Sequence, residues 1–592
     1  MIVVAIGLIA TLSFRRLLTE ALYTRFEKTL AAEVYQLKFQ NLEVNPLTRN
    51  ITIANVEIFP RDTSQHQYSY INSRLHLTTR KIILENVRLA KLLWGNALEL
   101  DKIKIVQPDV DFTLANHNIV FFPFREAQAD SIDTGKKQAL VSFVIKELDL
   151  EDAHFHVMNI DSSREGELQG INISLREITI QRETERDKIA YQHFDFSFDE
   201  LNGKWEHQEL RNFHFQDFKL RVDSLYFEQT PDTVMYHFSD ANISGHQLDI
   251  QTADSLFNIA LDSFYLHYRD RSIVLNHVSY TPNASEVALQ KRYPYRKEIF
   301  DVKADSIHVS DINFDSLMYV FKVFAKEIFV DSLSGSIYKN LTKPFPPHHR
   351  PKYLGQQVME YSIPISIDHV KITHAQLLNT EVKPDGGIGK VNITRGTVDI
   401  FNITNLPTTE PLKVEADAYV ENAAHAYVQL NFRYDLPQYT INANVKPFEM
   451  ASLNSFISSY SPAKINKGTS DGITFSGTVY ERYSRGNMKW LYHDLSIEMA
   501  PADKVTLTTI IKGLLANTII NNANPPSDNQ PTREVQVYVD RDMRTGFILM
   551  MVKSVLEGIQ ETLVMSKDNK MVYREAKDEM KKKEKAEKNG NR

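Results

Sequence analysis

Histidine is the residue type whose spacing in this sequence comes nearest to a site for metal or proton chemistry. His154 and His156 stand two residues apart in an alternating run, so a strand would direct both side chains to one face. Two imidazoles on one face can share a metal ion when a third ligand completes the set. No third ligand is evident near them in the sequence, and we therefore interpret them as residues that pack across strands.

Two further pairs of polar residues are of types that bind metals or catalyse proton transfer, but their spacing does not suit either role. His348 and His349 are adjacent in a proline-rich stretch, and adjacent side chains rarely converge on one ion, which favours a solvated loop. Asp305 and Asp311 are candidates for a carboxylate pair in general acid–base catalysis. Their surroundings are typical of turns and strand edges, so we do not expect a catalytic pair.

Motifs for enzymatic chemistry are absent from the sequence. There is no phosphate-binding Walker loop, no GxSxG nucleophile elbow, no HExxH zinc helix and no dinucleotide fingerprint. Cysteine is absent, which excludes disulfides, zinc–thiolate sites, iron–sulfur clusters and cysteine nucleophiles. The net charge of −7 over 592 residues provides no bulk attraction to nucleic acid. The sequence therefore predicts a protein that is not an enzyme and has no metal, cofactor or nucleic-acid partner.

The elements that carry these residues are predicted to be strands. Aromatic residues favour strands, and the chain has 32 Phe and 26 Tyr. Period-two alternation dominates between about residues 35 and 500. In one such run Phe194, Phe196 and Phe198 point one way, and the intervening Asp195 and Ser197 point the other. The sequence therefore predicts a mainly β body with one apolar and one polar face.

A looser repeat recurs along these strands, in which two alternating apolar residues are followed, after a three-residue step, by another such pair. The three-residue step changes the parity of the apolar positions, and a bulge or bend with one extra residue would return them to the same face. We therefore predict a bend in each of these strands. The copies are Ile103, Ile105, Pro108, Val110; Leu148, Leu150, Ala153, Phe155; Leu220, Val222, Leu225, Phe227; Ile307, Val309, Ile312, Phe314; and Val370, Ile372, Ala375, Leu377.

A proline-rich stretch divides the predicted β body into two regions. The stretch 343–357 has four prolines in fifteen residues, which disfavours regular structure. We place a first β region at 35–340, a proline-rich linker at 341–357 and a second β region at 358–500. Within the second region, PDGGIG at 384–389 predicts a turn.

The chain begins with an uncharged apolar segment, residues 1–14. As a helix it would span only ~21 Å, less than the ~30 Å hydrocarbon core of a bilayer. By length it is a signal-peptide core or part of a membrane anchor, and the alternative is a buried N-terminal helix. No convincing cleavage site follows, so we expect residues 1–34 to be the transmembrane and juxtamembrane part of a longer helix. Its apolar stripe consists of Leu18, Leu22, Phe26, Leu30 and Val34.

Helical periodicity returns after residue 500. Region 501–566 is predicted to contain amphipathic helices at 507–519 and 547–563, with a proline break at 524–526 and a short strand at 535–539 between them. The last region, 567–592, is rich in Lys and Glu and predicts a solvated, frayed tail.

The stretch from Lys464 onward resembles the C-terminal signature of the AsmA-like proteins of bacterial envelopes. In that family a strand that opens with Lys-Gly is followed by a Gly-x-Met strand and then by Tyr-x-Asp-Leu. The matching residues are Lys467-Gly468, Gly486 with Met488, and Tyr492, Asp494 and Leu495. The sequences ANTIINNANPP and FILMMVKSVLEGIQETL are similar to the closing part of the family. The specific resemblance covers about a hundred residues, with looser agreement elsewhere.

The resemblance implies a single-pass protein of the bacterial inner membrane with its bulk in the periplasm. The family is related to bridge-like lipid-transfer proteins, which implies an elongated, curled antiparallel β-sheet forming a U-shaped apolar groove. Such a groove would bind phospholipids or other acyl lipids and support their transport between inner and outer membranes, or outer-membrane homeostasis. The strand pattern agrees, since a long sheet with one apolar face and few helices must curl, pair with another sheet or hold lipid.

Strongly alternating runs supply the candidate groove residues. Alternation identifies an apolar face without indicating what covers it. The candidates are Phe194, Phe196, Phe198, Phe213, Phe215, Ile473 and Phe475.

The same strands leave an alternative open. A closed β-sandwich stack would bury these apolar faces in protein and act as a structural or assembly factor for outer-membrane biogenesis, with envelope or outer-membrane proteins as partners. An envelope hydrolase would need converging polar residues, which we cannot assemble from this sequence.

Overall fold

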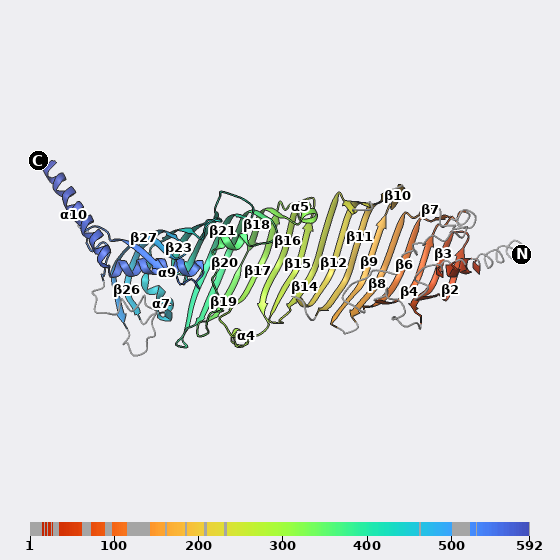
Figure 1. Ribbon diagram of the computed structural model, residues 1–592, viewed down its shortest axis with the longest axis horizontal. Coiled ribbons are helices and arrows are strands. Elements are labelled where there is room, and N and C mark those ends of the chain that lie inside the picture. The colour runs from red at the N-terminus through yellow and green to blue at the C-terminus, as the bar shows by residue number, and fades with distance from the viewer. Residues whose placement is uncertain are drawn as a thin grey trace, which may run out of the picture. The chain divides into compact units, whose positions relative to one another are not determined.

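The protein is mainly β-sheet in a computed structural model of the chain (Figure 1). The described residues form two compact units, unit 1 (1–270) and unit 2 (271–592). In each unit, long strands lie side by side (Figure 1). The structure describes residues 15–27 (apart from 17, 21 and 25), 35–61, 73–88, 91, 97–114, 142–159, 163–183, 186–205, 210–229, 234–460, 463–499, 521–527 and 530–590.

The main sheet of unit 1 follows the order of the chain. Its pairing order is β3-β4-β6-β8-β9-β11-β12-β14-β15, with β1 and β2 beside β3, β10 beside β11, and β13 beside β12. β5 and β7 form a separate parallel pair. The bounds are β1 Tyr35–Lys38, β2 Asn41–Asn45, β3 Asn50–Pro60, β4 Ser73–Glu85, β5 Ala97–Glu99, β6 Lys102–Leu114, β7 Ser142–Val144, β8 Glu147–Asn159, β9 Arg164–Arg176, β10 Thr179–Glu183, β11 Arg186–Trp205, β12 Leu210–Gln229, β13 Val234–His237, β14 Asp240–Thr252 and β15 Phe257–His267.

The sheet of unit 2 begins with β16 and β17 and ends with β27 and β28. β18 and β19 both pair with β17 on one side and with β20 on the other, and the order then continues β21-β22-β23-β24-β26-β27, with β25 beside β26. The bounds are β16 Ser272–Pro282, β17 Glu298–Ser310, β18 Val323–Asp331, β19 Ser334–Asn340, β20 Ile365–Val382, β21 Ile388–Thr404, β22 Leu412–Val420, β23 Ala424–Phe432, β24 Tyr439–Val445, β25 Phe448–Glu449, β26 Ala463–Val479, β27 Tyr483–Met499 and β28 Glu534–Asp540.

The helices of unit 2 lie in its connections and at its C-terminal end. Two short helices begin with side-chain caps: Ser285 Oγ accepts from the Ala288 amide, and Asn313 Oδ1 accepts from the Ser316 amide. The turn predicted at 384–389 is confirmed between β20 and β21. The helix bounds are α4 Glu286–Arg292, α5 Phe314–Val320, α6 Leu354–Met359, the 3₁₀ helix η2 Met450–Leu453, α7 Asn454–Tyr460, α9 Phe547–Leu563 and α10 Lys567–Gly590.

The predicted bends are confirmed in four of the five copies, and a single left-handed residue makes each one. This residue precedes the third apolar position, so the apolar residues before and after it return to the same face of the sheet. In the copy that starts at Ile307 the prediction is wrong, because β17 ends at Ser310 and α5 begins at Phe314, so the left-handed Asp311 follows the strand. The β8–β9 and β20–β21 pairings shift register at these positions. The left-handed residues, with φ between 50° and 53°, are Gln107, Asp152, Ser224, Asp311 and His374.

The prediction of an antiparallel sheet is correct for most strand pairs of the main sheets and wrong for three of them. β6 and β8 pair in parallel in unit 1, and β18 and β19 both pair in parallel with β20 in unit 2. A parallel neighbour requires the chain to return to the end of the sheet from which the first strand started, through a connection of a dozen or more residues. The chain between β6 and β8 and the chain between β19 and β20 both have that length. Both units therefore contain mixed sheets.

The proline-rich segment 341–357 lies within unit 2 and does not separate two sheets. The strands before it pair with β20 after it. Its residues also contact the C-terminal part of the unit, since Tyr353 Oη donates to Tyr480 O at 2.8 Å and Arg541 Nη2 donates to Pro351 O at 2.8 Å. The division between compact units falls at 270/271 instead.

At the N-terminal end, the described residues between 15 and 27 are mostly helical and pack on the sheet. Leu18 is buried with Leu42 and Ile51, and Phe26 packs beside Tyr35. Residues 1–14 of the expected anchor, together with Leu30 and Val34, lie outside the described residues. Among the residues that are described, no helix combines the length and apolar content that crossing a bilayer requires.

At the C-terminal end, the strand predicted at 535–539 is confirmed as β28 and the helix at 547–563 as α9. The helix predicted at 507–519 lies outside the described residues. The prediction of a frayed tail is wrong, because residues 567–590 form the helix α10. Asn569 holds the start of α10 against β28, since its side chain accepts from Gln536 N at 2.8 Å and donates to Gln536 O at 3.0 Å.

Candidate functional site

Five phenylalanine rings form a cluster on the apolar face of unit 1. Phe198 stacks on Phe218 with ring centroids 5.0 Å apart, and Phe215 stacks on Phe264 at 5.7 Å. Phe198 and Phe215 are buried, whereas the other rings are half-buried, so the cluster keeps part of its surface accessible. This aromatic cluster consists of Phe196, Phe198, Phe215, Phe218 and Phe264.

Cross-strand pairing extends the apolar face on both sides of the cluster. Phe196 of β11 lies opposite Ile173 of β9 and Leu220 of β12. Leu220 lies opposite Ile243 of β14, which in turn lies opposite Leu266 of β15. Because directly opposite residues share a face, one apolar row crosses five neighbouring strands.

Glycines bring two of the rings down onto the backbone of a neighbouring strand. A Cβ at Gly203 would lie 1.9 Å from the Phe213 ring, and a Cβ at Gly245 would lie 2.3 Å from the Phe215 ring. A ring can occupy this space only where the residue beneath it lacks a side chain. The two glycines therefore define where Phe213 and Phe215 lie on the apolar face.

The structure brings five of the seven candidate groove residues to this face: Phe194, Phe196, Phe198, Phe213 and Phe215. Their role in lipid binding stays a prediction. Sequence reasoning missed two members of the aromatic cluster, Phe218 and Phe264. The signal for Phe218 was present, because the left-handed residue Asp217 produces the three-residue step that follows Phe215.

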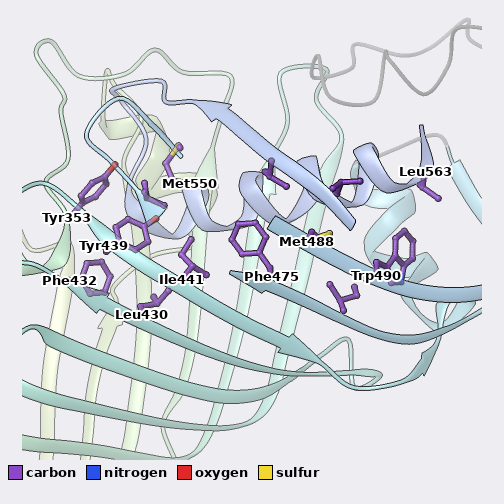
Figure 2. Close-up of a cluster of buried hydrophobic side chains, with 14 of the residues drawn as sticks. Tyr353, Leu430, Phe432, Tyr439, Ile441, Phe475, Met488, Trp490, Met550 and Leu563 are labelled. Atoms are coloured by element: carbon purple, nitrogen blue, oxygen red, sulfur yellow. The ribbon is translucent and has the colours of Figure 1, made fainter. Parts of the chain in front are cut away.

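The other two candidates, Ile473 and Phe475, are wrong as groove residues. They are 6% and 3% exposed and belong to a closed core between the sheet of unit 2 and α9. Figure 2 shows Phe475 in this core. The helix approaches closely, because a Cβ at Gly558 would lie 2.6 Å from Met488 Sδ. This C-terminal core includes Leu430, Phe432, Tyr439, Ile441, Ile473, Phe475, Met488, Trp490, Met550 and Leu563.

The two apolar faces thus differ in what covers them. In unit 2, α9 packs along β26, β27 and β28, and its side chains fill the core (Figure 2). In unit 1, the described helical residues between 15 and 27 pack against strands β1 to β4. Within the described part of unit 1, no helix lies over the aromatic cluster.

The opposite face of unit 1 carries polar side chains and a shallow hollow of about 700 Å³. Four charged residues of its lining form two pairs: Arg176 donates to Asp149, and Arg221 Nε donates to Asp195 Oδ1 at 2.7 Å. Burial by itself would raise the pKa of the Asp149 carboxyl, but hydrogen bonds from Arg176 and Lys102 outweigh it and hold that pKa below its usual range. In each of these two pairs the acid and the base therefore satisfy each other.

His154 lies on the same polar face between two carboxylates. Its Nδ1 is 2.7 Å from Asp109 Oδ1 of β6, and its Nε2 is 3.0 Å from Glu167 Oε1 of β9. His156 lies similarly beside Asp111 and Glu165. The prediction that these histidines pack across strands is therefore confirmed. Burial alone would lower the pKa of His154, but the hydrogen bonds to the two carboxylates raise it above the ordinary value.

We expect the protonation of His154 to stabilise unit 1 under acidic conditions. A raised pKa in the folded state gives stabilisation that is complete below the unfolded value of ~6.5 and is lost as pH rises through the folded pKa. Asp109→Asn should lower the midpoint of the His154 ring titration, measured by NMR. Asp385→Asn, at an exposed turn of unit 2, should leave it unchanged. An unaltered midpoint in Asp109→Asn would contradict the pairing.

The remaining polar candidates do not converge. The His349 ring stacks on the Phe345 ring with centroids 5.5 Å apart. Asp311 follows the end of β17, and its Oδ2 lies 4.0 Å from Lys326 Nζ. Within the described ranges, no group of three or more His, Asp or Glu side chains could hold a metal ion.

Comparison of the chain with models of known protein families and with curated proteins finds no match.

Proposed function

We propose that the protein binds the acyl chains of phospholipids on the apolar face of unit 1. The proposal depends on one observation: the aromatic cluster and the apolar row beside it have no described helix over them. We further propose that the protein is anchored in the bacterial inner membrane, with its body in the periplasm, and supports lipid transport between inner and outer membranes. The AsmA-like resemblance of residues from Lys464 onward supports this setting.

The dimensions and energetics of the apolar row suit an acyl chain. Five strands spaced ~4.8 Å apart give a row ~19 Å across, compared with ~15 Å for one leaflet of a ~30 Å hydrocarbon core. Each CH₂ group that leaves water for such a surface gains ~0.8 kcal/mol. Because apolar residues recur on successive strands, this gain changes little with position, so a chain can slide at little cost. Net direction would then require an external sink or energy source.

Lipid occupancy of two variants of the same strand tests the proposal. Phe196→Asp places a charge on the apolar face within the aromatic cluster, whereas Ser197→Asp places one on the polar face. We expect mass spectrometry of co-purifying lipids to show a severalfold lower lipid-to-protein ratio for full-length Phe196→Asp and an unchanged ratio for Ser197→Asp. Unaltered occupancy in Phe196→Asp, or unfolding detected by circular dichroism, would contradict acyl-chain binding there.

The closed core under α9 favours a second candidate function. A filled interior is what a structural or assembly factor for outer-membrane biogenesis would have, and unit 2 has one between the sheet and α9. Under this alternative, purified protein carries no lipid and instead crosslinks to a defined envelope protein. The lipid measurement therefore separates the two candidates.

A further inference from the structure

Six large apolar side chains are exposed at one end of two neighbouring strands of unit 2. They come from the connections that lead into β18 and β20, whose first residues, Val323 and Ile365, are partners in a parallel pairing. The Val323 amide also donates to Pro364 O at 2.9 Å, which fixes the two connections beside each other. This edge patch consists of Tyr319, Val320, Phe321, Met359, Tyr361 and Ile363, which are between 44% and 74% exposed.

The backbone holds the edge patch outward. The amides of Phe321 and Lys322 both donate to Ser316 O, which fixes the C-terminal turn of α5. The Asn405 side-chain amide donates to the carbonyls of Tyr361 and Ile363, at 2.9 Å each. These bonds prevent the loop from folding its apolar side chains inward.

Phe321 is the most exposed member, and its conformation is unfavourable for an aromatic residue. It has φ 52° and ψ 45°, the left-handed region that glycine and asparagine tolerate best, and it is 74% exposed. Neither the exposure nor the backbone conformation is compensated by packing of this ring within the fold. An external partner that takes up the ring would compensate for the exposure.

Charge and area indicate which partner the edge patch fits. The nearby charges are few, since Lys352 pairs with Glu360, Lys326 Nζ lies 4.0 Å from Asp311 Oδ2, and Lys322 adds one positive charge beside Phe321. The six side chains expose on the order of 600 Å² in total, given ~150–250 Å² for a whole aromatic side chain. Stable protein interfaces bury ~800 Å² from each partner on average, so this patch is at the low end of their size range. A small, nearly neutral patch with two tyrosines among aliphatic residues is instead typical of insertion at a membrane–water interface.

We infer that the edge patch inserts into the surface of a phospholipid bilayer. The tyrosine hydroxyls lie at the level of the headgroups, and Phe321 and Ile363 enter the acyl region. Because Lys322 adds only one positive charge beside Phe321, binding needs no anionic lipid and depends only weakly on salt. This contact is separate from acyl-chain binding on unit 1.

The absence of cysteine permits a site-specific test on the full-length chain. An environment-sensitive fluorophore is attached at Val320→Cys, with a matched control at Ile388→Cys. Ile388 is 59% exposed at the β20–β21 turn, the other end of β20. With phosphatidylcholine vesicles, we expect a blue shift and quenching by acyl-chain quenchers at position 320 and neither at 388. Equal responses, no response at 320, or a concentration-dependent response without vesicles, which would indicate a second copy, each overturn the inference.

A second variant removes the ring without loss of folding. Asparagine tolerates the left-handed conformation, so Phe321→Asn should keep or raise the thermal unfolding midpoint. In the Val320→Cys background, we expect it to lower the vesicle-induced signal at least fivefold. The Phe196→Asp variant should retain that signal, which keeps failure of this inference distinct from failure of the proposed function. Full vesicle binding by Phe321→Asn would overturn the inference.

Discussion

Replacing Phe475 with alanine is expected to lower the free energy of unfolding of unit 2 by about 3–5 kcal/mol, the range for a buried phenylalanine. The side chain is 3% exposed, between the sheet and α9. Its ring lies over the cross-strand pair Gly477 and Gly486, where added Cβ atoms would come within 2.9 and 2.8 Å of it. Because glycines have no side chain that could move into the vacated space, we expect a cavity to remain and the loss to be near the upper end.

Chemical denaturation followed by tryptophan fluorescence measures this loss, since Trp490 lies in the same core. Phe300→Ala is the matched control, because Phe300 is 36% exposed in the same unit. We expect the control to cost about 1 kcal/mol or less, in proportion to the smaller apolar area it buries. Equal losses in the two variants would show that Phe475 does not lie in a closed core.

Replacing Asn524 with alanine is expected to cost about 3–5 kcal/mol through lost hydrogen bonds. Asn524 is 1% exposed, and its side-chain amide donates to the carbonyls of Trp490 and Arg533. Its Oδ1 accepts from the Arg533 amide at 2.7 Å. Alanine would leave these buried groups without their partner, and each unsatisfied group costs ~1–3 kcal/mol.

Amide hydrogen exchange tests whether the missing hydrogen bonds cause the lower free energy of unfolding of Asn524→Ala. The Arg533 amide should exchange faster in Asn524→Ala, because its acceptor is gone, while denaturation reports the change in unfolding free energy. Asn444→Ala, on the exposed face of β24, should change stability by no more than ~0.5 kcal/mol. Protection of the Arg533 amide that survives in Asn524→Ala would contradict this account.

The bends were predictable from sequence because each one leaves a local trace. A left-handed residue shifts the parity of the apolar positions around it, so the three-residue step at Asp152 or Ser224 is visible without any tertiary information. The strand at 535–539 and the helix at 547–563 were predictable for the same reason, since period and burial agree within one element.

The candidate site was predictable only in part, as Phe196 and Phe475 demonstrate. Both residues lie in strongly alternating runs, and alternation records only that one face is apolar. Whether that face is open depends on α9, which packs on Phe475 from more than 70 residues away in the chain. The parallel pairing of β18 with β20 is likewise a choice between distant segments that the local pattern does not record.

The sequence by itself determined that this protein is mainly β, with strands that carry an apolar face and bend at single residues, because these properties depend on neighbours a few positions apart. Tertiary structure alone decided which apolar faces are covered, which strands run parallel and which neighbouring connections leave Phe321 and Tyr361 exposed. The physical reason is that burial depends on contacts between segments distant in the chain. The hydrophobic effect is non-directional and stabilises any contact that removes apolar surface from water, so the local pattern does not specify which segment makes that contact.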